Sequence, residues 1–153
     1  MNEVLIRKAE LKDLETLLQF EQGVISAERP FDETLKPDPI NYCDMTELIT
    51  APHVYLIVAE FNNELIGSGY ARIENSKPYN RHEQHAYLGF MYVVPSFRGK
   101  GVNGLIIKTL KEWTIWQGLN EMRLNVYDNN ESAIKAYEKV GFSKHMIEMR
   151  MGL

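Results

Sequence analysis

The stretch that decides the fold is Val93-Val94-Pro95-Ser96-Phe97-Arg98-Gly99-Lys100-Gly101-Val102-Asn103-Gly104, in which an apolar run stops at a proline and a glycine-rich turn opens an amphipathic helix. Its three glycines allow the backbone to turn sharply and to approach a ligand without interference from Cβ atoms. Successive N–H groups of such a turn, together with the N-terminus of the helix, can converge on an anion. Arg98 and Lys100 add positive charge there. The stretch therefore predicts a phosphate-binding turn.

Two common phosphate-binding motifs do not account for this turn. A P-loop ends in Lys followed by Ser or Thr, whereas Lys100 is followed by Gly101. Gly99, Gly101 and Gly104 meet the order G-x-G-x-x-G of dinucleotide-binding domains, but no acidic residue follows about 20 positions on in a second βαβ unit of the usual kind. The region before the turn indicates a meander of strands without crossover helices. A nicotinamide-binding domain is therefore not expected.

The turn resembles the acetyl-coenzyme A loop of the GCN5-related N-acetyltransferases, which reads Q/R-x-x-G-x-G/A after a strand that ends in V-x-P. Val93-x-Pro95 and the run Arg98 to Asn103 fit this pattern, except that Asn103 replaces the last small residue and Gly104 follows at once. The family's second signature, N-x-x-A-x-x-x-Y with K-x-G-F downstream, is met by residues 130–142. The two motifs are correctly ordered and spaced, and the resemblance is specific from about Tyr87 to Phe142.

The resemblance implies that acetyl-CoA is the cosubstrate and that it transfers its acetyl group directly to a primary amine of a small metabolite. In the family's fold the strand around Tyr92 and the strand around Asn125 splay apart, the pantetheine arm lies in the gap, and the loop amides hold the pyrophosphate. The residues that this implies for acetyl-CoA binding are Met91, Tyr92, Val93, Arg98, Gly99, Lys100, Gly101, Val102, Asn103, Gly104 and Asn130.

The resemblance also supplies a catalytic candidate, Tyr137, whose phenol would protonate the departing thiolate. Asn130 would hydrogen-bond the pantetheine or cap the helix that carries Tyr137. The alternative is structural: Tyr137 is one more residue on an apolar helix face between Ala133 and Val140, and Asn130 belongs only to the start of that helix.

No general base stands where the family often places a carboxylate. The matching positions are Gly89 or Phe90 and Asn125, none of which can accept a proton. Glu83 and His85 lie on the approach to that strand, but at about 3.3 Å per residue they are some ten ångströms or more from the sulfur. We therefore expect a water relay, or selection of the neutral fraction of the acceptor amine, rather than direct proton abstraction.

The segment Glu28-Arg29-Pro30-Phe31-Asp32 is the most unusual cluster outside the motifs. In the family's fold it borders the acceptor cleft, so Arg29 would clamp a carboxylate or phosphate of the substrate while Glu28 or Asp32 meets the amine. The alternative is a salt-bridged loop with no role in binding.

The composition predicts a single domain over residues 1–153. A net charge of −4, from 17 basic and 21 acidic residues, gives no polycationic face for nucleic acid. The lone Cys43 excludes an intramolecular disulfide and a cysteine-only zinc site, no metal is expected, and a reducing compartment is favoured. No segment has the pattern of an export signal or a membrane span, so we expect a cytoplasmic protein with no membrane partner.

The pattern along the chain predicts an α+β fold in the order β-α-α-β-β-β-α-β-α-β, with a mostly antiparallel sheet flanked by helices. The expected strands are 4–9, 54–61, 64–73, 85–94, 122–127 and 142–151, and the expected helices are 11–25, 45–49, 102–116 and 133–140. Two other functions stay open: acetylation of a protein N-terminus or lysine, and a coenzyme A-binding module that has lost catalysis. The sequence is also compatible with a homodimer.

Overall fold

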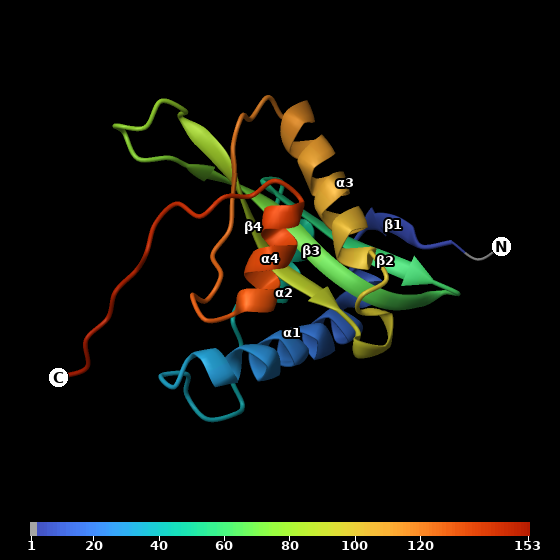
Figure 1. Cartoon of the computed structure of the whole chain (residues 1–153). Coiled ribbons are helices and arrows are strands. Elements are labelled where there is room, and N and C mark those ends of the chain that lie inside the picture. The colour runs from blue at the N-terminus through green and yellow to red at the C-terminus, as the bar shows by residue number, and fades with distance from the viewer. Residues whose placement is uncertain (1–2) are drawn as a thin grey trace.

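A computed structural model describes residues 3–153 and contains one five-stranded sheet with helices on both faces (Figure 1). The strand order is β1-β2-β3-β4-β5, in which the first three pairings are antiparallel and β4 pairs with β5 in parallel. The elements are β1 (Leu5–Lys8), η1 (Leu11–Asp13), α1 (Leu14–Glu28), η2 (Arg29–Phe31), α2 (Met45–Thr50), β2 (Val54–Phe61), β3 (Glu64–Asn75), β4 (Gln84–Val93), η3 (Pro95–Phe97), α3 (Val102–Trp116), β5 (Met122–Arg123) and α4 (Glu131–Lys139).

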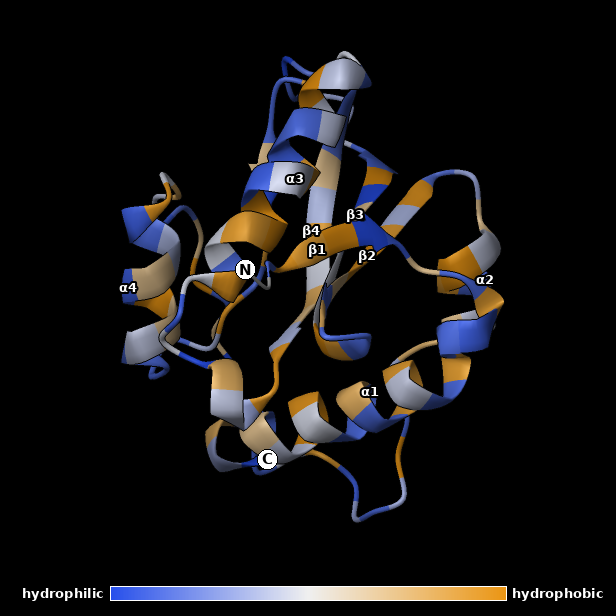
Figure 2. Ribbon diagram, turned by 90° about the vertical axis from the view of Figure 1, so that its right-hand side faces the viewer, coloured by the Kyte–Doolittle hydropathy of each residue, from blue (hydrophilic) through white to orange (hydrophobic). Residues whose placement is uncertain are grey.

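The interior strand β2 carries apolar residues toward both faces of the sheet, because successive side chains of a strand point to opposite sides. Leu56 and Val58 pack with α1 and α2, whereas Ile57 and Ala59 pack with α3. The helices need only one apolar side, and in Figure 2 they show alternating orange and blue bands. The result is two hydrophobic cores, one on each face of the sheet.

The turn between β2 and β3 has the form predicted from its sequence. Asn62 and Asn63 both adopt positive φ, at 51° and 65°, and they join Phe61 directly to its partner Glu64. Two-residue hairpin turns require this conformation, and Asn tolerates it better than most residues.

The structure confirms the α+β class and the mostly antiparallel sheet, but two predicted elements differ. The fifth strand ends at Arg123 instead of Tyr127, and the strand predicted at residues 142–151 does not form. The cause is the same in both cases: a strand needs a hydrogen-bonded neighbour, and neither segment has one within residues 3–153. Local alternation of apolar and polar residues indicates strand preference but does not supply a partner.

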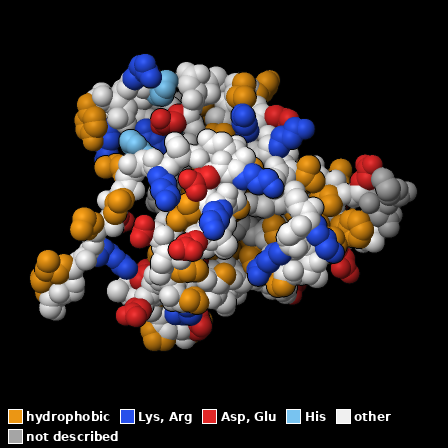
Figure 3. All heavy atoms as spheres, viewed as in Figure 1, with side chains coloured by type: hydrophobic (Ala, Val, Ile, Leu, Met, Phe, Trp, Pro, Cys, Tyr) orange, Lys and Arg blue, Asp and Glu red, His pale blue; other side chains and the backbone are white. Residues whose placement is uncertain are grey.

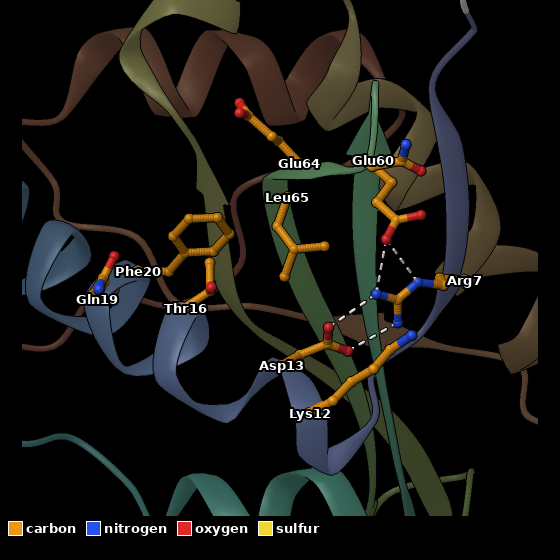
Figure 4. A pocket seen from close by; sticks show the side chains of 10 residues that line it. Arg7, Lys12, Asp13, Thr16, Gln19, Phe20, Glu60, Glu64 and Leu65 are labelled. Carbon is orange, nitrogen blue, oxygen red and sulfur yellow. Dashed lines mark hydrogen bonds and ion pairs between the residues drawn. The ribbon is translucent and has the colours of Figure 1, made fainter.

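A hollow of about 530 Å³ lies between β1, α1 and the β2–β3 turn, and an ion-pair cluster lines it (Figure 4). Arg7 donates two hydrogen bonds to Asp13, at 2.8 and 2.9 Å, and one from Nη2 to Oε1 of Glu60 at 3.0 Å. Asp13 is buried and also accepts from the Glu10 N–H at 2.8 Å. These charges satisfy one another, and none of the residues assigned to acetyl-CoA lines the hollow, so the cluster joins β1 to α1 and β2.

Arg7→Met is expected to lower the free energy of unfolding by about 2–3 kcal/mol, because it leaves the buried Asp13 carboxylate without its cation. Arg7 also lowers the pKa of Asp13 below its ordinary value of 3.8. This contribution is therefore present above about pH 4 and is lost as the pH falls further. Urea titrations at pH 7 and pH 3 check this, with Lys12→Met as the control. A wild type and Arg7→Met of equal stability at pH 7 would contradict it.

Candidate active site

The glycine-rich turn leads directly into the N-terminus of α3. Gly99 and Gly101 adopt positive φ, at 76° and 85°, and Gly101 is the N-cap. The Leu105 N–H donates to the Gly101 carbonyl at 3.2 Å, so the amides of residues 102–104 precede the hydrogen-bonded ladder of the helix. A Cβ atom at Gly99, Gly101 or Gly104 would meet nothing within 4 Å. The turn can therefore present backbone N–H groups to an anion, as the sequence predicts.

The two basic residues of the turn rest against aromatic rings. Arg98 donates from Nε to the Val93 carbonyl at 2.9 Å, and its guanidinium lies 5.7 Å from the centre of the Tyr92 ring. Lys100 lies 5.2 Å from the centre of the Phe97 ring. Arg98 thus fixes the turn to the end of β4, and both cations stay near the N-terminus of α3. Val102 is buried in the core below, and Asn103 is half-buried.

β4 has a free edge beside this turn. It pairs with β5 only at Ala86 and Tyr87, so within the described residues its later part has no neighbour on that side. The Val94 N–H donates to the Ile66 carbonyl of β3, which turns the main-chain groups of Val93 to the other side, where the Val93 carbonyl accepts from Arg98. Those of Met91 share that side because main-chain groups alternate along a strand. The sequence predicted these two residues for the pantetheine, and their main chain lies along the free edge.

A β-bulge at Phe90 marks the start of this free edge. Phe90 has a φ of 56°, which is rare for an aromatic residue, and the register between β3 and β4 shifts here. The Ser68 hydroxyl donates to the Phe90 carbonyl at 3.1 Å and holds the bulge. Strained backbone that the surroundings hold in place is frequent beside active sites. No feature of the sequence indicates this strain.

The structure also explains why Gly89 cannot carry a carboxylate. A Cβ atom there would collide with the phenol of Tyr70, which occupies the space beside β4. Tyr70 is buried, burial raises its pKa, and Arg72 lies 5.3 Å from the centre of its ring. A neutral phenol therefore fills the space that a base at this position would need.

α4 begins at Asn130 and carries Tyr137. Oδ1 of Asn130 accepts from the Ala133 N–H at 3.3 Å, so Asn130 caps the helix, one of the two functions expected for it. The Tyr137 ring meets the Phe142 ring edge to face, with centres 5.9 Å apart. Burial raises the pKa of Tyr137, and the charge of Glu28 is the second cause. The charge that acts on Tyr137 thus comes from Glu28, a residue 109 positions earlier in the chain.

Glu28, the last residue of α1, lies among tyrosines. The Tyr42 hydroxyl donates to its Oε2 at 2.8 Å. Burial raises the pKa of Glu28, the Tyr42 hydrogen bond opposes this, and the charge of Asp32 adds to the increase. The charge of Glu28 in turn contributes to raised pKa values of Tyr87 and Tyr127. Sequence reasoning missed Tyr42 and Tyr127, because a single tyrosine in a loop or at a strand end carries no pattern.

The other two charged residues of the predicted acceptor cluster already have partners. Arg29 donates to Oδ1 of Asp38 at 2.6 Å. Asp32 accepts from the Thr34 N–H at 2.9 Å, from the Tyr127 hydroxyl at 3.2 Å and from Arg150 at 3.2 Å. The hydrogen bonds from the Thr34 hydroxyl, from the Thr34 N–H and from Arg150 lower the pKa of Asp32. Among the described residues, Glu28 forms no ion pair, so it is the acidic group of this cluster that has no cation.

Glu83 and His85 lie at the opposite end of β4 from the glycine-rich turn. His85 is buried, its Nδ1 lies 2.8 Å from the Ser76 hydroxyl, and burial lowers its pKa. Glu83 is exposed, and its carbonyl accepts from the Ser76 N–H at 2.8 Å. Both residues hold the hairpin between β3 and β4.

The described residues offer no clustered metal ligands and no helix that could span a membrane. Residues 3–153 contain no group of three or more His, Cys, Asp or Glu side chains arranged to hold a metal ion. None of the helices in the same range is long and apolar enough to cross a membrane.

Comparisons with known proteins agree with this geometry. The sequence profile of the acetyltransferase (GNAT) family matches residues 13–142. A thialysine N-epsilon-acetyltransferase from Sus scrofa is 28% identical over 152 residues, which cover 92% of this chain and 85% of that protein. A Bacillus halodurans protein has a TM-score of 0.88 at 17% identity, covering 97% of this chain and 99% of the other.

A structure titled as a predicted acetyltransferase with acetyl-CoA, from Clostridium acetobutylicum, has a TM-score of 0.74 at 19% identity and covers 98% of this chain and 96% of the other. At such identities the solved structures establish the fold alone. The family profile extends over most of the chain and includes the glycine-rich turn, the free edge of β4 and the helix of Tyr137. The chain belongs to the GNAT family and is an N-acetyltransferase.

Proposed function

We propose that this enzyme transfers the acetyl group of acetyl-CoA directly to a primary amine of a small metabolite. The observation that carries the proposal is the free edge of β4 beside the glycine-rich N-terminus of α3, which together offer main-chain groups to the pantetheine and pyrophosphate of acetyl-CoA. Glu28, at the end of α1, has no cation among the described residues and would meet the amine. Tyr137, on α4, would protonate the departing thiolate.

The donor site uses mainly backbone groups. The amides from Gly99 to Gly104 would bind the pyrophosphate at the N-terminus of α3, with Arg98 and Lys100 adding charge. The pantetheine would lie along the free edge of β4 and bond to the main chain of Met91 and Val93. Asn103 fits this arrangement because its N–H, and not its side chain, would contact the phosphates.

The chemistry requires a neutral amine, a polarised thioester carbonyl and a proton for the leaving thiolate. Glu28 would bind the ammonium form of the acceptor, and water would take one proton from it to give the neutral amine. The amine nitrogen then attacks the thioester carbon, and a C–N bond forms. As the tetrahedral intermediate collapses, the C–S bond breaks and Tyr137 gives its phenolic proton to the sulfur. The amine's second proton returns to the phenolate through water.

The acceptor is a compact amine in this proposal. Two carboxylates, those of Glu28 and Asp32, would face the acceptor amine. The relative from Sus scrofa is named for N-epsilon-acetylation of thialysine. Arg29 would select an acceptor with an anionic group only if the substrate displaced Asp38. The lone Cys43 supports a cytoplasmic location.

Turnover with a panel of amines tests the proposal. Purified protein and acetyl-CoA are mixed with amino acids that carry side-chain amines, polyamines, amino sugars and unstructured peptides, and release of free thiol is followed. We expect turnover with at least one small amine. Activity on peptides alone would favour protein acetylation, and acetyl-CoA binding without turnover of any amine would favour a binding module.

Glu28→Gln is expected to lower kcat/KM for the small amine by about 10–100-fold, mainly through KM, since it removes the charge that binds the ammonium. The affinity for acetyl-CoA should not change. The control is Glu33→Gln, which removes an exposed carboxylate from the same loop. Arg29→Ala in the same assay tests whether the acceptor carries an anionic group, because the substitution raises KM only if Arg29 contacts the acceptor. Equal kinetics of Glu28→Gln and wild type would contradict the assignment of Glu28.

A further inference from the structure

Residues 40–43, called the strap here, lie beside α1 in the stretch of chain between η2 and α2. Gln22 of α1 donates from Nε2 to the Ile40 carbonyl at 2.9 Å. At the lower left of Figure 3, in the region where α1 ends in Figure 1, charged side chains of both signs lie on the surface. Glu21 differs from these groups, because it is 1% exposed and lies between α1 and the strap.

Glu21 holds the strap by one carboxylate oxygen. Its Oε2 accepts from the Tyr42 N–H at 3.1 Å, from the Cys43 N–H at 3.2 Å and from the Cys43 thiol at 3.2 Å. Burial, and then the hydrogen bond to Glu21, raise the pKa of the Cys43 thiol to about 12, so the thiol keeps its proton and donates. The other oxygen, Oε1, is buried with no hydrogen-bond partner among the described residues. Such an oxygen costs folding free energy, so this arrangement favours a role for Glu21 beyond stability.

Tyr42 connects Glu21 to Glu28. The two glutamates are seven residues apart in α1, nearly two helical turns, so they lie on the same face of the helix. Tyr42 contacts both, because its N–H donates to Glu21 at 3.1 Å and its hydroxyl donates to Oε2 of Glu28 at 2.8 Å. Burial and the hydrogen bond to Glu28 raise the pKa of Tyr42, so the phenol remains a donor at neutral pH. The place of the Glu28 carboxylate therefore depends on where Glu21 holds the main chain of Tyr42.

We propose that Glu21 is a positioning residue for the acceptor amine, because it holds Tyr42 and Tyr42 in turn holds the carboxylate of Glu28. The Tyr42 hydroxyl occupies Oε2 of Glu28, so the ammonium group of the acceptor would bind Oε1. A carboxylate that is held before the substrate arrives loses less side-chain entropy on binding than one that moves freely. The inference rests on the proposed function in one respect, the assignment of Glu28 to the amine.

Steady-state kinetics of Glu21→Leu and Tyr42→Phe, singly and combined, test this inference with thialysine or with the small amine of the panel that is turned over fastest. Glu21→Leu removes the oxygen that holds the strap, and Tyr42→Phe removes the hydrogen bond to Glu28. We expect each variant to raise KM for the amine by about 5–20-fold, with kcat changed less than about twofold and the affinity for acetyl-CoA unchanged. The double variant should raise KM no further than Glu21→Leu alone, because both changes break the same connection.

Glu21→Gln is the conservative variant. It keeps a carbonyl oxygen that accepts from the Tyr42 N–H, so KM should stay within about twofold of the wild type. Glu21→Asp keeps the charge but shortens the side chain by one methylene, and it should raise KM severalfold even if Glu21→Leu does not fold. The matched control is Asp13→Leu, which removes another buried carboxylate, one that bonds to Arg7 and to the Glu10 N–H. It should lower the melting temperature and leave KM unchanged.

The results that would overturn this inference differ from those that would overturn the proposed function. Wild-type KM in Glu21→Leu and Glu21→Asp, with a raised KM in Glu28→Gln, shows that Glu28 binds the amine without help from Glu21. Additive effects of Glu21→Leu and Tyr42→Phe show that Glu21 does not act through Tyr42. Equal impairment by Glu21→Gln and Glu21→Leu shows that the charge of Glu21, and not its hold on the strap, is what counts. Wild-type kinetics of Glu28→Gln, or no turnover of any small amine, removes the assignment of Glu28 and this inference with it.

Discussion

Tyr137→Phe is expected to lower kcat by about 10²–10⁴-fold, the usual range for loss of a positioned acid, with little change in the affinity for acetyl-CoA. The substitution removes only the hydroxyl and keeps the ring that packs edge to face on Phe142. Burial and the Glu28 charge raise the pKa of Tyr137 above its ordinary value of 10, so the phenol holds its proton throughout the neutral range. The loss should therefore be the same at every pH from 6 to 9.

The matched control is Tyr127→Phe, which removes a hydroxyl from the same neighbourhood without removing the expected acid. Its hydroxyl donates to Asp32, so we expect a modest change, below about tenfold, in KM for the amine. Steady-state kinetics and calorimetric binding of acetyl-CoA separate the two variants. An unchanged kcat for Tyr137→Phe, together with a lower melting temperature, would instead assign Tyr137 to the core.

The parts of the fold that depend on neighbouring residues in the chain could be predicted from the sequence. The glycine-rich turn needs positive φ at Gly99 and Gly101, and the sequence supplies glycine at both positions. The Asn62-Asn63 turn and the apolar stripe of α3 follow in the same way from local conformational preference and from the helical period. Each of these features is encoded within about fifteen residues.

The parts that depend on distant contacts could not be predicted. The Tyr127 hydroxyl donates to Asp32 across 95 positions of the chain, and the charge of Glu28 raises the pKa of Tyr137 across 109 positions. The absence of a carboxylate at Gly89 could be read from the sequence, whereas its cause, the Tyr70 phenol in the same space, required the packing of β3 against β4. The segment 142–151 is a similar case, because its alternation predicts a strand but does not supply a neighbouring strand.

Gly101→Glu is expected to weaken acetyl-CoA binding by about 100-fold or more. Gly101 is the N-cap of α3 at a φ of 85°, and the space where its Cβ would stand is open to the proposed pyrophosphate site. A glutamate there places a negative charge against the phosphates and competes with them for the positive end of the helix dipole. It also adds bulk and imposes a backbone conformation that L residues rarely adopt.

Two further variants separate charge from strain. Gly101→Ala carries the strain without the charge, and Gly118→Glu carries both at the other end of α3, where φ is 79° and the surroundings are equally open. If the turn binds the pyrophosphate, titration calorimetry gives a large loss of affinity for Gly101→Glu, a smaller loss for Gly101→Ala and none for Gly118→Glu, although Gly118→Glu melts at a lower temperature. Equal affinity of wild type and Gly101→Glu, or no binding to either, would contradict the assignment of this turn to acetyl-CoA.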